Sequence, residues 1–120
     1  MYDMTHLEIY ANSIPWSKGN EKQLNQYEHD FLGLMHDKYG FVESASQKPV
    51  KIPLGLHGQA RALHSKDEKL VYITQHEERT YLTTITVLIG KDRERLDSIV
   101  ESTIRFHDSR GYINKGRITL

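Results

Sequence analysis

Apolar and β-branched residues alternate with polar ones along two neighbouring segments near the middle of the chain. KLVYITQ (69–75) and TYLTTITVLI (80–89) flank the polar tetrad HEER (76–79). Alternation with a period of two is typical of β-strands, and a short polar segment between two such runs predicts a hairpin. In the second run, apolar side chains occupy both faces, as they do in a strand with neighbours on both sides. We therefore predict a central strand at 80–89.

Further strands are predicted before and after this hairpin. GQARALHS (58–65) leads into it through the turn SKDE (65–68). LEIYANSI (7–14), near the N-terminus, alternates imperfectly until Pro15 stops it. YINKGRITL (112–120) is a candidate closing strand.

A helix is predicted at 21–39, where apolar residues recur at helical spacing. These residues are Leu24, Tyr27, Phe31, Leu34 and Met35. Asn20 is the expected N-cap, with Gln23 as its capping-box partner, and Gly40 is placed to end the helix in a left-handed conformation.

A second helix is predicted after Gly90-Lys91-Asp92, with Asp92 as its N-cap, and it ends near Arg110-Gly111. Its expected buried stripe consists of Leu96, Ile99, Val100, Thr103 and Phe106.

The predicted order of elements is β-α-β-β-β-α, followed by the candidate closing strand. This order predicts an α+β fold, with two helices on an antiparallel sheet of about four to five strands. The segment 41–53 contains two prolines and is predicted as a loop, with a candidate edge strand at 50–56. At 120 residues and 14.0 kDa, with neither repeats nor a linker, 1–120 is expected to be a single domain.

The composition excludes several kinds of chemistry. The chain has no cysteine, which rules out disulfides, Cys-ligated zinc and thiol catalysis. No apolar run approaches the roughly 20 residues needed to span a bilayer. The N-terminus MYDMTHLEIY has neither the basic nor the apolar region of a signal peptide. We therefore expect a cytoplasmic protein that does not associate with membranes.

Charge is balanced overall but unevenly distributed. Residues 1–46 carry three basic and seven acidic side chains, whereas residues 47–120 carry thirteen basic and nine acidic ones. The net charges of the two parts are therefore −4 and +4. This asymmetry allows an anionic partner on the C-terminal part, although it is much weaker than in a dedicated nucleic-acid-binding domain.

Basic side chains gather around the first predicted hairpin, at Arg61, His64, Lys66 and Lys69. If the alternation places Arg61 outward, its guanidinium and the Lys69 ammonium can bind a phosphate together. His64 is the candidate for proton transfer, because histidine is the usual general acid or base near neutral pH. Such a set suits RNA cleavage without a metal. A solvated hairpin with scattered charges fits the same residues.

The C-terminal part offers a second group of candidates. Arg105, Arg110 and Tyr112, together with Lys66, are the candidate nucleic-acid contacts, and His107 is a candidate for proton transfer. The same cations also suit a helix end, where positive charge offsets the helix dipole.

The remaining signals are weaker. The histidine pairs His29/His36 and His57/His64 each lack a third ligand at a defined spacing, so neither a metal site nor a cofactor is predicted. Trp16 is either a core residue or, together with Tyr10, part of a stacking platform for a base.

The pattern LHGQARALHSKDEKLVYITQ…YLTTITVLIGK resembles the core of RelE-type mRNA-interferase toxins and is closest in layout to the YafO branch. The resemblance covers about 55–110. It implies that Arg61 matches the arginine of the first basic strand and Lys69 the cation before Leu-Val-Tyr. It also implies that His107 and Tyr112 stand in for the catalytic histidine and tyrosine near the C-terminus, although here they follow a helix.

The resemblance implies a toxin that cleaves mRNA, ribosome-dependent and metal-independent, with a cognate antitoxin as its partner. The alternative is a non-enzymatic interaction module of phage or mobile-element type. It would bind a host protein or a small anionic ligand, with the hairpin and the second helix as a partner or homodimer interface. The neutral charge, the lack of a sharp catalytic motif and a free edge strand favour this alternative.

Overall fold

The computed structural model describes residues 5–43, 59–77 and 80–117. Within these ranges, six strands and two long helices confirm the α+β class, with more strands in the sheet than the four to five predicted. In chain order, the elements are β1 (His6–Pro15), the short 3-10 helix η1 (Lys18–Asn20), α1 (Glu21–Tyr39), β2 (Val42–Glu43), β3 (Gln59–Ser65), β4 (Glu68–Glu77), β5 (Tyr81–Gly90), α2 (Arg93–Ser109) and β6 (Ile113–Arg117).

The strands form one antiparallel sheet in the order β2-β3-β4-β5-β1-β6. β5 lies between β4 and β1, which confirms the predicted central strand, and β6 is the predicted closing strand. β2 lies in a segment that we predicted to be a loop. This correction has a simple cause: the prolines that disfavour pairing come later, at 49 and 53. The predicted edge strand at 50–56 is outside the described residues.

The first helix, α1, has the predicted bounds. Gly40 follows it in the left-handed region, with a φ of 75°, and its backbone N–H donates to the His36 carbonyl at 2.9 Å. Asn20 precedes the helix, but its side chain makes no capping hydrogen bond. A capping box requires an extended backbone at the N-cap residue. The backbone of Asn20 (φ −99°, ψ 5°) instead continues from η1 and is not extended. The predicted capping box of Asn20 and Gln23 is therefore wrong.

The second helix, α2, begins as the sequence predicts. The Asp92 side chain accepts a hydrogen bond from the Arg95 backbone N–H at 3.2 Å and so caps the helix. The expected apolar stripe is buried except for Val100, which is half-buried. Two polar residues that the spacing did not predict are also buried: Ser102 and His107. Neither α1 nor α2, nor any other helix in the described ranges, is long and apolar enough to cross a membrane.

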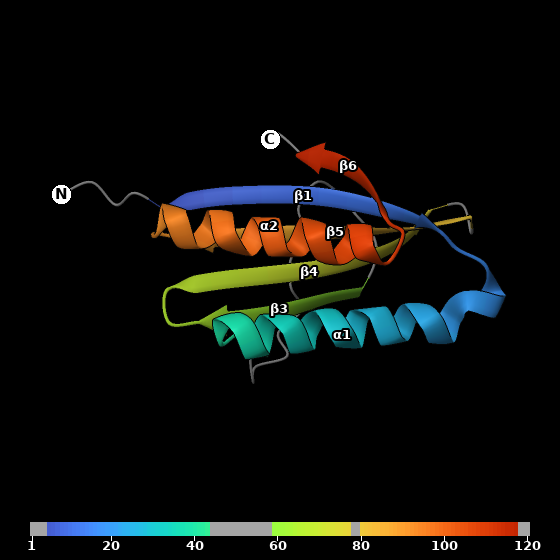
Figure 1. Cartoon of the computed structure of the whole chain (residues 1–120), viewed down its shortest axis with the longest axis horizontal. Coiled ribbons are helices and arrows are strands. Elements are labelled where there is room, and N and C mark those ends of the chain that lie inside the picture. The colour runs from blue at the N-terminus through green and yellow to red at the C-terminus, as the bar shows by residue number, and fades with distance from the viewer. Residues whose placement is uncertain (1–4, 44–58, 78–79, 118–120) are drawn as a thin grey trace.

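Both helices cover the same face of the sheet and run in opposite directions (Figure 1). The core between helices and sheet contains Phe31, Met35, Tyr39, Phe41, Leu63, Leu70, Tyr72, Leu88, Leu96, Ile99 and Phe106. Burial of each large apolar side chain contributes about 1.5–3 kcal/mol, so this cluster provides much of the driving force for folding. A smaller cluster on the other face contains Ile9, Ala11, Ile73, Ile85 and Val87.

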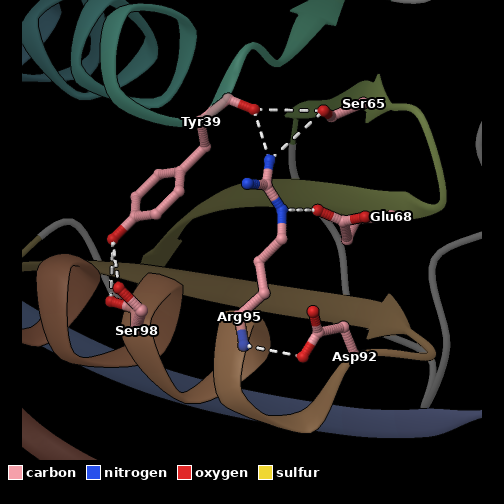
Figure 2. A network of polar contacts seen from close by, with 6 residues as sticks. All are labelled: Tyr39, Ser65, Glu68, Asp92, Arg95 and Ser98. Carbon is pink, nitrogen blue, oxygen red and sulfur yellow. Dashed lines mark hydrogen bonds and ion pairs between the residues drawn. The ribbon is translucent and has the colours of Figure 1, made fainter.

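One arginine connects three elements at the end of this core (Figure 2). Arg95, in the first turn of α2, forms an ion pair with Glu68 of β4, whose side chain is only 5% exposed. Its Nη2 also donates to the Tyr39 carbonyl at the end of α1, at 2.6 Å. The Ser65 hydroxyl donates to the same carbonyl at 3.0 Å. Arg95 therefore holds the end of α1, the β3–β4 turn and the start of α2 together.

We expect Arg95→Ala to lower the free energy of unfolding by roughly 3 kcal/mol, because it leaves the buried Glu68 carboxylate without its partner. Urea denaturation measures this change. Arg105→Ala is the matched control, since Arg105 is 78% exposed and lies 3.9 Å from Glu101, and it should cost under about 1 kcal/mol. Equal losses in the two variants would show that the Glu68 pair has no special role.

Candidate functional site

The sheet surface beneath the helices is apolar at one end and polar at the other. In an antiparallel sheet, directly paired residues point to the same face. Leu63, Leu70 and Leu88 form one such row below the core. Four residues further along β4, a polar row crosses the sheet, made of Thr74, Thr84 and Asn12. The helices therefore cover a sheet surface that becomes polar toward one end.

A pocket of about 410 Å³ lies at this polar end. The floor is formed by Tyr72, Thr74 and His76 of β4 and by Leu82 of β5. The remaining lining residues are Glu21, Leu24, Asn25 and Glu28 of α1, together with Trp16 and Tyr112. This volume is within the range of about 300–1,000 Å³ that is usual for small-molecule sites.

Aromatic side chains form part of the pocket wall. The ring of Trp16 packs against the imidazole of His76, with 4.7 Å between ring centroids. A backbone hydrogen bond from the Trp16 N–H to the Thr80 carbonyl, at 2.7 Å, fixes this position. The buried indole N–H of Trp16 has no hydrogen-bond partner in the described ranges. Trp16 is half-buried and lines the pocket, so it is not a core residue, and its aromatic partner is His76 and not Tyr10.

Acidic side chains form the α1 wall. Glu21 and Glu28 are seven residues apart, which is about two helical turns, so both lie on the face that borders the pocket. Glu28 also accepts a hydrogen bond from the Arg61 Nε at 2.5 Å, while Arg61 Nη1 donates to Glu43 at 2.9 Å. Burial opposes the charged form of Arg61, but these two carboxylates produce a net rise in its pKa. Among the described lining residues of the pocket there is no lysine or arginine.

Next to the pocket, His107 forms a buried polar cluster with two of the lining residues, Tyr72 and Tyr112. The Nδ1 of His107 lies 2.8 Å from the Thr103 carbonyl, which can only accept, so this nitrogen carries the proton. The other nitrogen, Nε2, then accepts from the Tyr72 hydroxyl at 3.1 Å. The Tyr112 ring meets the imidazole edge-on, with 4.8 Å between centroids.

Burial determines the protonation states of this cluster. His107 is fully buried, and desolvation lowers its pKa to about 4. Desolvation also raises the pKa of both Tyr72 and Tyr112. All three groups are therefore uncharged at neutral pH.

The structure separates the residues predicted for the first hairpin. Arg61 pairs with Tyr72 and so points to the helix-covered face, while His64 pairs with Lys69 and both point to the other face. Lys66 is exposed in the turn between β3 and β4. The prediction that Arg61 and Lys69 grip one phosphate is therefore wrong, because a period of two places them on opposite sides of the sheet.

The C-terminal candidates are divided between surface and interior. Arg105 is exposed on α2, and Arg110 follows the helix with its guanidinium over the Phe106 ring at 4.3 Å. Tyr112, a candidate nucleic-acid contact, is only 5% exposed and lines the pocket, so it does not share the open surface with Arg105. The cause is the turn after α2, which brings Tyr112 back against His107, where both are shielded by α1.

Comparisons with known proteins add no relative: no family model matches the chain, and neither a curated protein nor a solved structure is significantly similar to it. In the part of the chain that the structure describes, no group of three or more histidine, aspartate or glutamate side chains is placed to hold a metal ion. The function must therefore be inferred from the geometry of the pocket.

The buried His107 makes stability dependent on pH. In the unfolded chain this histidine protonates near pH 6.5, whereas in the folded protein it stays neutral down to about pH 4. Its contribution is therefore complete above pH 6.5 and is lost as the pH falls toward 4, by roughly 3 kcal/mol for a difference of about 2.5 pKa units.

We expect His107→Phe to remove this component, and urea denaturation between pH 7 and pH 4 measures it against the wild type. Because carboxylates also titrate in this range, the informative quantity is the difference between the two curves. If stability falls with pH equally in the wild type and in His107→Phe, the pKa of His107 is not lowered in the folded state.

Proposed function

We propose that this chain is a non-enzymatic binding module whose pocket receives a positively charged group of its partner. The observation that supports this proposal is the composition of the wall, where Glu21 and Glu28 border the same pocket as Trp16, Tyr72 and Tyr112. Carboxylates attract a cation, and aromatic faces, above all that of tryptophan, add a cation–π attraction.

The pocket favours a cation over the small anion that the basic hairpin suggested. Arg61, whose guanidinium contacts the lining residue Glu28, is also held by Glu43 and adds no unbalanced positive charge. Glu21 forms no ion pair with any residue in the described ranges, so its charge is available to a ligand. An anion would therefore meet uncompensated negative charge at the rim, which is unfavourable.

The matching partner is a protein that inserts an arginine or lysine side chain. A volume of about 410 Å³ accommodates the long aliphatic stem together with the charged head. Arginine is also enriched among the residues that contribute most to protein–protein binding energy. A host protein with an exposed basic side chain fits this description.

The simplest probe is Nα-acetyl-arginine amide, whose only charge is the guanidinium, and isothermal titration calorimetry measures its binding. We expect saturable binding that Glu21→Gln weakens about fivefold, as is usual for a partly exposed charge pair, and that Glu21→Gln with Glu28→Gln weakens further. Glu101→Gln, which removes an exposed carboxylate on α2, is the matched control and should have no effect.

Nα-acetyl-citrulline amide has nearly the same shape without the guanidinium charge and should not bind. Equal binding of the two amides, or wild-type affinity in the Glu21 and Glu28 variants, would contradict the proposal. Circular dichroism of each variant checks that the fold is retained.

A second candidate is the RelE-like mRNA interferase, and one observation favours it. His107 and Tyr112, which the resemblance pairs as catalytic groups, contact each other at 4.8 Å between centroids, and Tyr112 lines the pocket. The burial and low pKa of His107 and the pairing of Arg61 with two carboxylates favour the binding module instead.

Induced expression in a bacterial host distinguishes the two candidates. For a binding module we expect intact mRNA at all times, even if growth slows because a host protein is captured. For an interferase, translation stops early and mRNA is cut only when ribosomes are present. Under that second outcome, His107→Phe should prevent the cuts, and Arg61→Ala with Lys69→Ala tests the positions that the resemblance assigns.

A further inference from the structure

A shallow groove lies between α1 and α2 and is separate from the pocket described above. Its volume is about 420 Å³. α1 contributes Asp30, Leu34 and Lys38, whose spacing of four places them along one side of the helix. The other wall consists of Ser102, Arg105, Phe106, Ser109 and Arg110.

The base of this groove is apolar. Phe106 belongs to the core, and Leu34 packs against the same core from α1 while remaining half-buried. The two side chains therefore present apolar surface between the helices. The hydroxyls of Ser102 and Ser109, both on α2, are the only uncharged polar side-chain groups among the described lining residues.

The rim of the groove carries an excess of positive charge. Lys38 donates to the Ser102 hydroxyl at 3.1 Å and forms no ion pair with a residue in the described ranges. Arg110 lies 3.6 Å from Asp30, the one acidic lining residue. Arg105 is largely exposed, with only a long contact to Glu101. Two of the three cations are therefore available to a negatively charged partner.

We propose that this groove docks an acidic amphipathic helix of a partner protein. From Asp30 to Lys38 the wall extends over about 12 Å of α1, which corresponds to roughly two turns of a third helix. A helix of this kind places its apolar residues on Leu34 and Phe106. Its flanking Asp or Glu side chains then reach Lys38 on one side and Arg105 on the other.

A helix fits the groove better than a nucleic acid does. A phosphate backbone would pair with the cations but would leave the apolar surface of Leu34 and Phe106 uncovered. The proposal is independent of the cation pocket, since the two sites share no lining residue.

Fluorescence anisotropy with a fluorescein-labelled amphipathic peptide built from Leu and Glu tests this docking. We expect saturable binding by the full chain, weakened about tenfold by Lys38→Glu with Arg105→Glu. Lys22→Glu with Lys115→Glu changes the net charge equally at exposed positions elsewhere and should stay within about twofold of the wild type.

The milder pair Lys38→Gln with Arg105→Gln serves if the charge reversal disturbs folding, and it should also weaken binding. A peptide in which Gln replaces every Glu should bind much more weakly. The absence of saturable binding to the wild type, equal losses in the two double variants, or preferential binding of single-stranded poly(U) RNA would each overturn the proposal.

Discussion

The pairing of Arg95 with the buried Glu68 carboxylate is the constraint on which the arrangement of the helices depends. A carboxylate at 5% exposure is tolerated only with a close partner, so α2 must begin where its first turn brings Arg95 to Glu68. The same guanidinium holds the carbonyl of Tyr39, and α1 must therefore end there as well (Figure 2). The three elements that meet at this point are joined by one polar network, and the apolar core lies beside this network.

This fixed end explains why a pocket is present at the other end. Near Arg95 the helices rest on leucines of β3, β4 and β5, where close packing is favourable. Further along, the sheet carries Thr74, Thr84 and Asn12, which offer less apolar surface for the helices to bury. Thr74 of that row lines the pocket, while Thr84 and Asn12 are fully buried, so the pocket borders the polar end of the sheet.

The net charge of the chain is zero, but its two candidate sites carry charges of opposite sign. Glu21 and Glu28 make the pocket acidic, whereas Lys38 and Arg105 make the groove between the helices basic. Helix α1 provides both carboxylates of the pocket, Glu21 and Glu28. It also provides one cation of the groove, Lys38. The binding module that we propose would contact a partner at both surfaces, which increases affinity without a large interface.

The sequence by itself determined the α+β class, the central strand, the bounds of α1 and the Asp92 cap, because these follow from local periodicity and local hydrogen bonds. It also pointed to His107 and Tyr112, although not to their burial. Only the tertiary structure decided that Arg61 and Lys69 lie on opposite faces and that Glu21, Glu28, Trp16 and His76 border one pocket. The physical reason is that strand register and the placement of α1 over β4 depend on long-range packing, and no pattern within one segment encodes it.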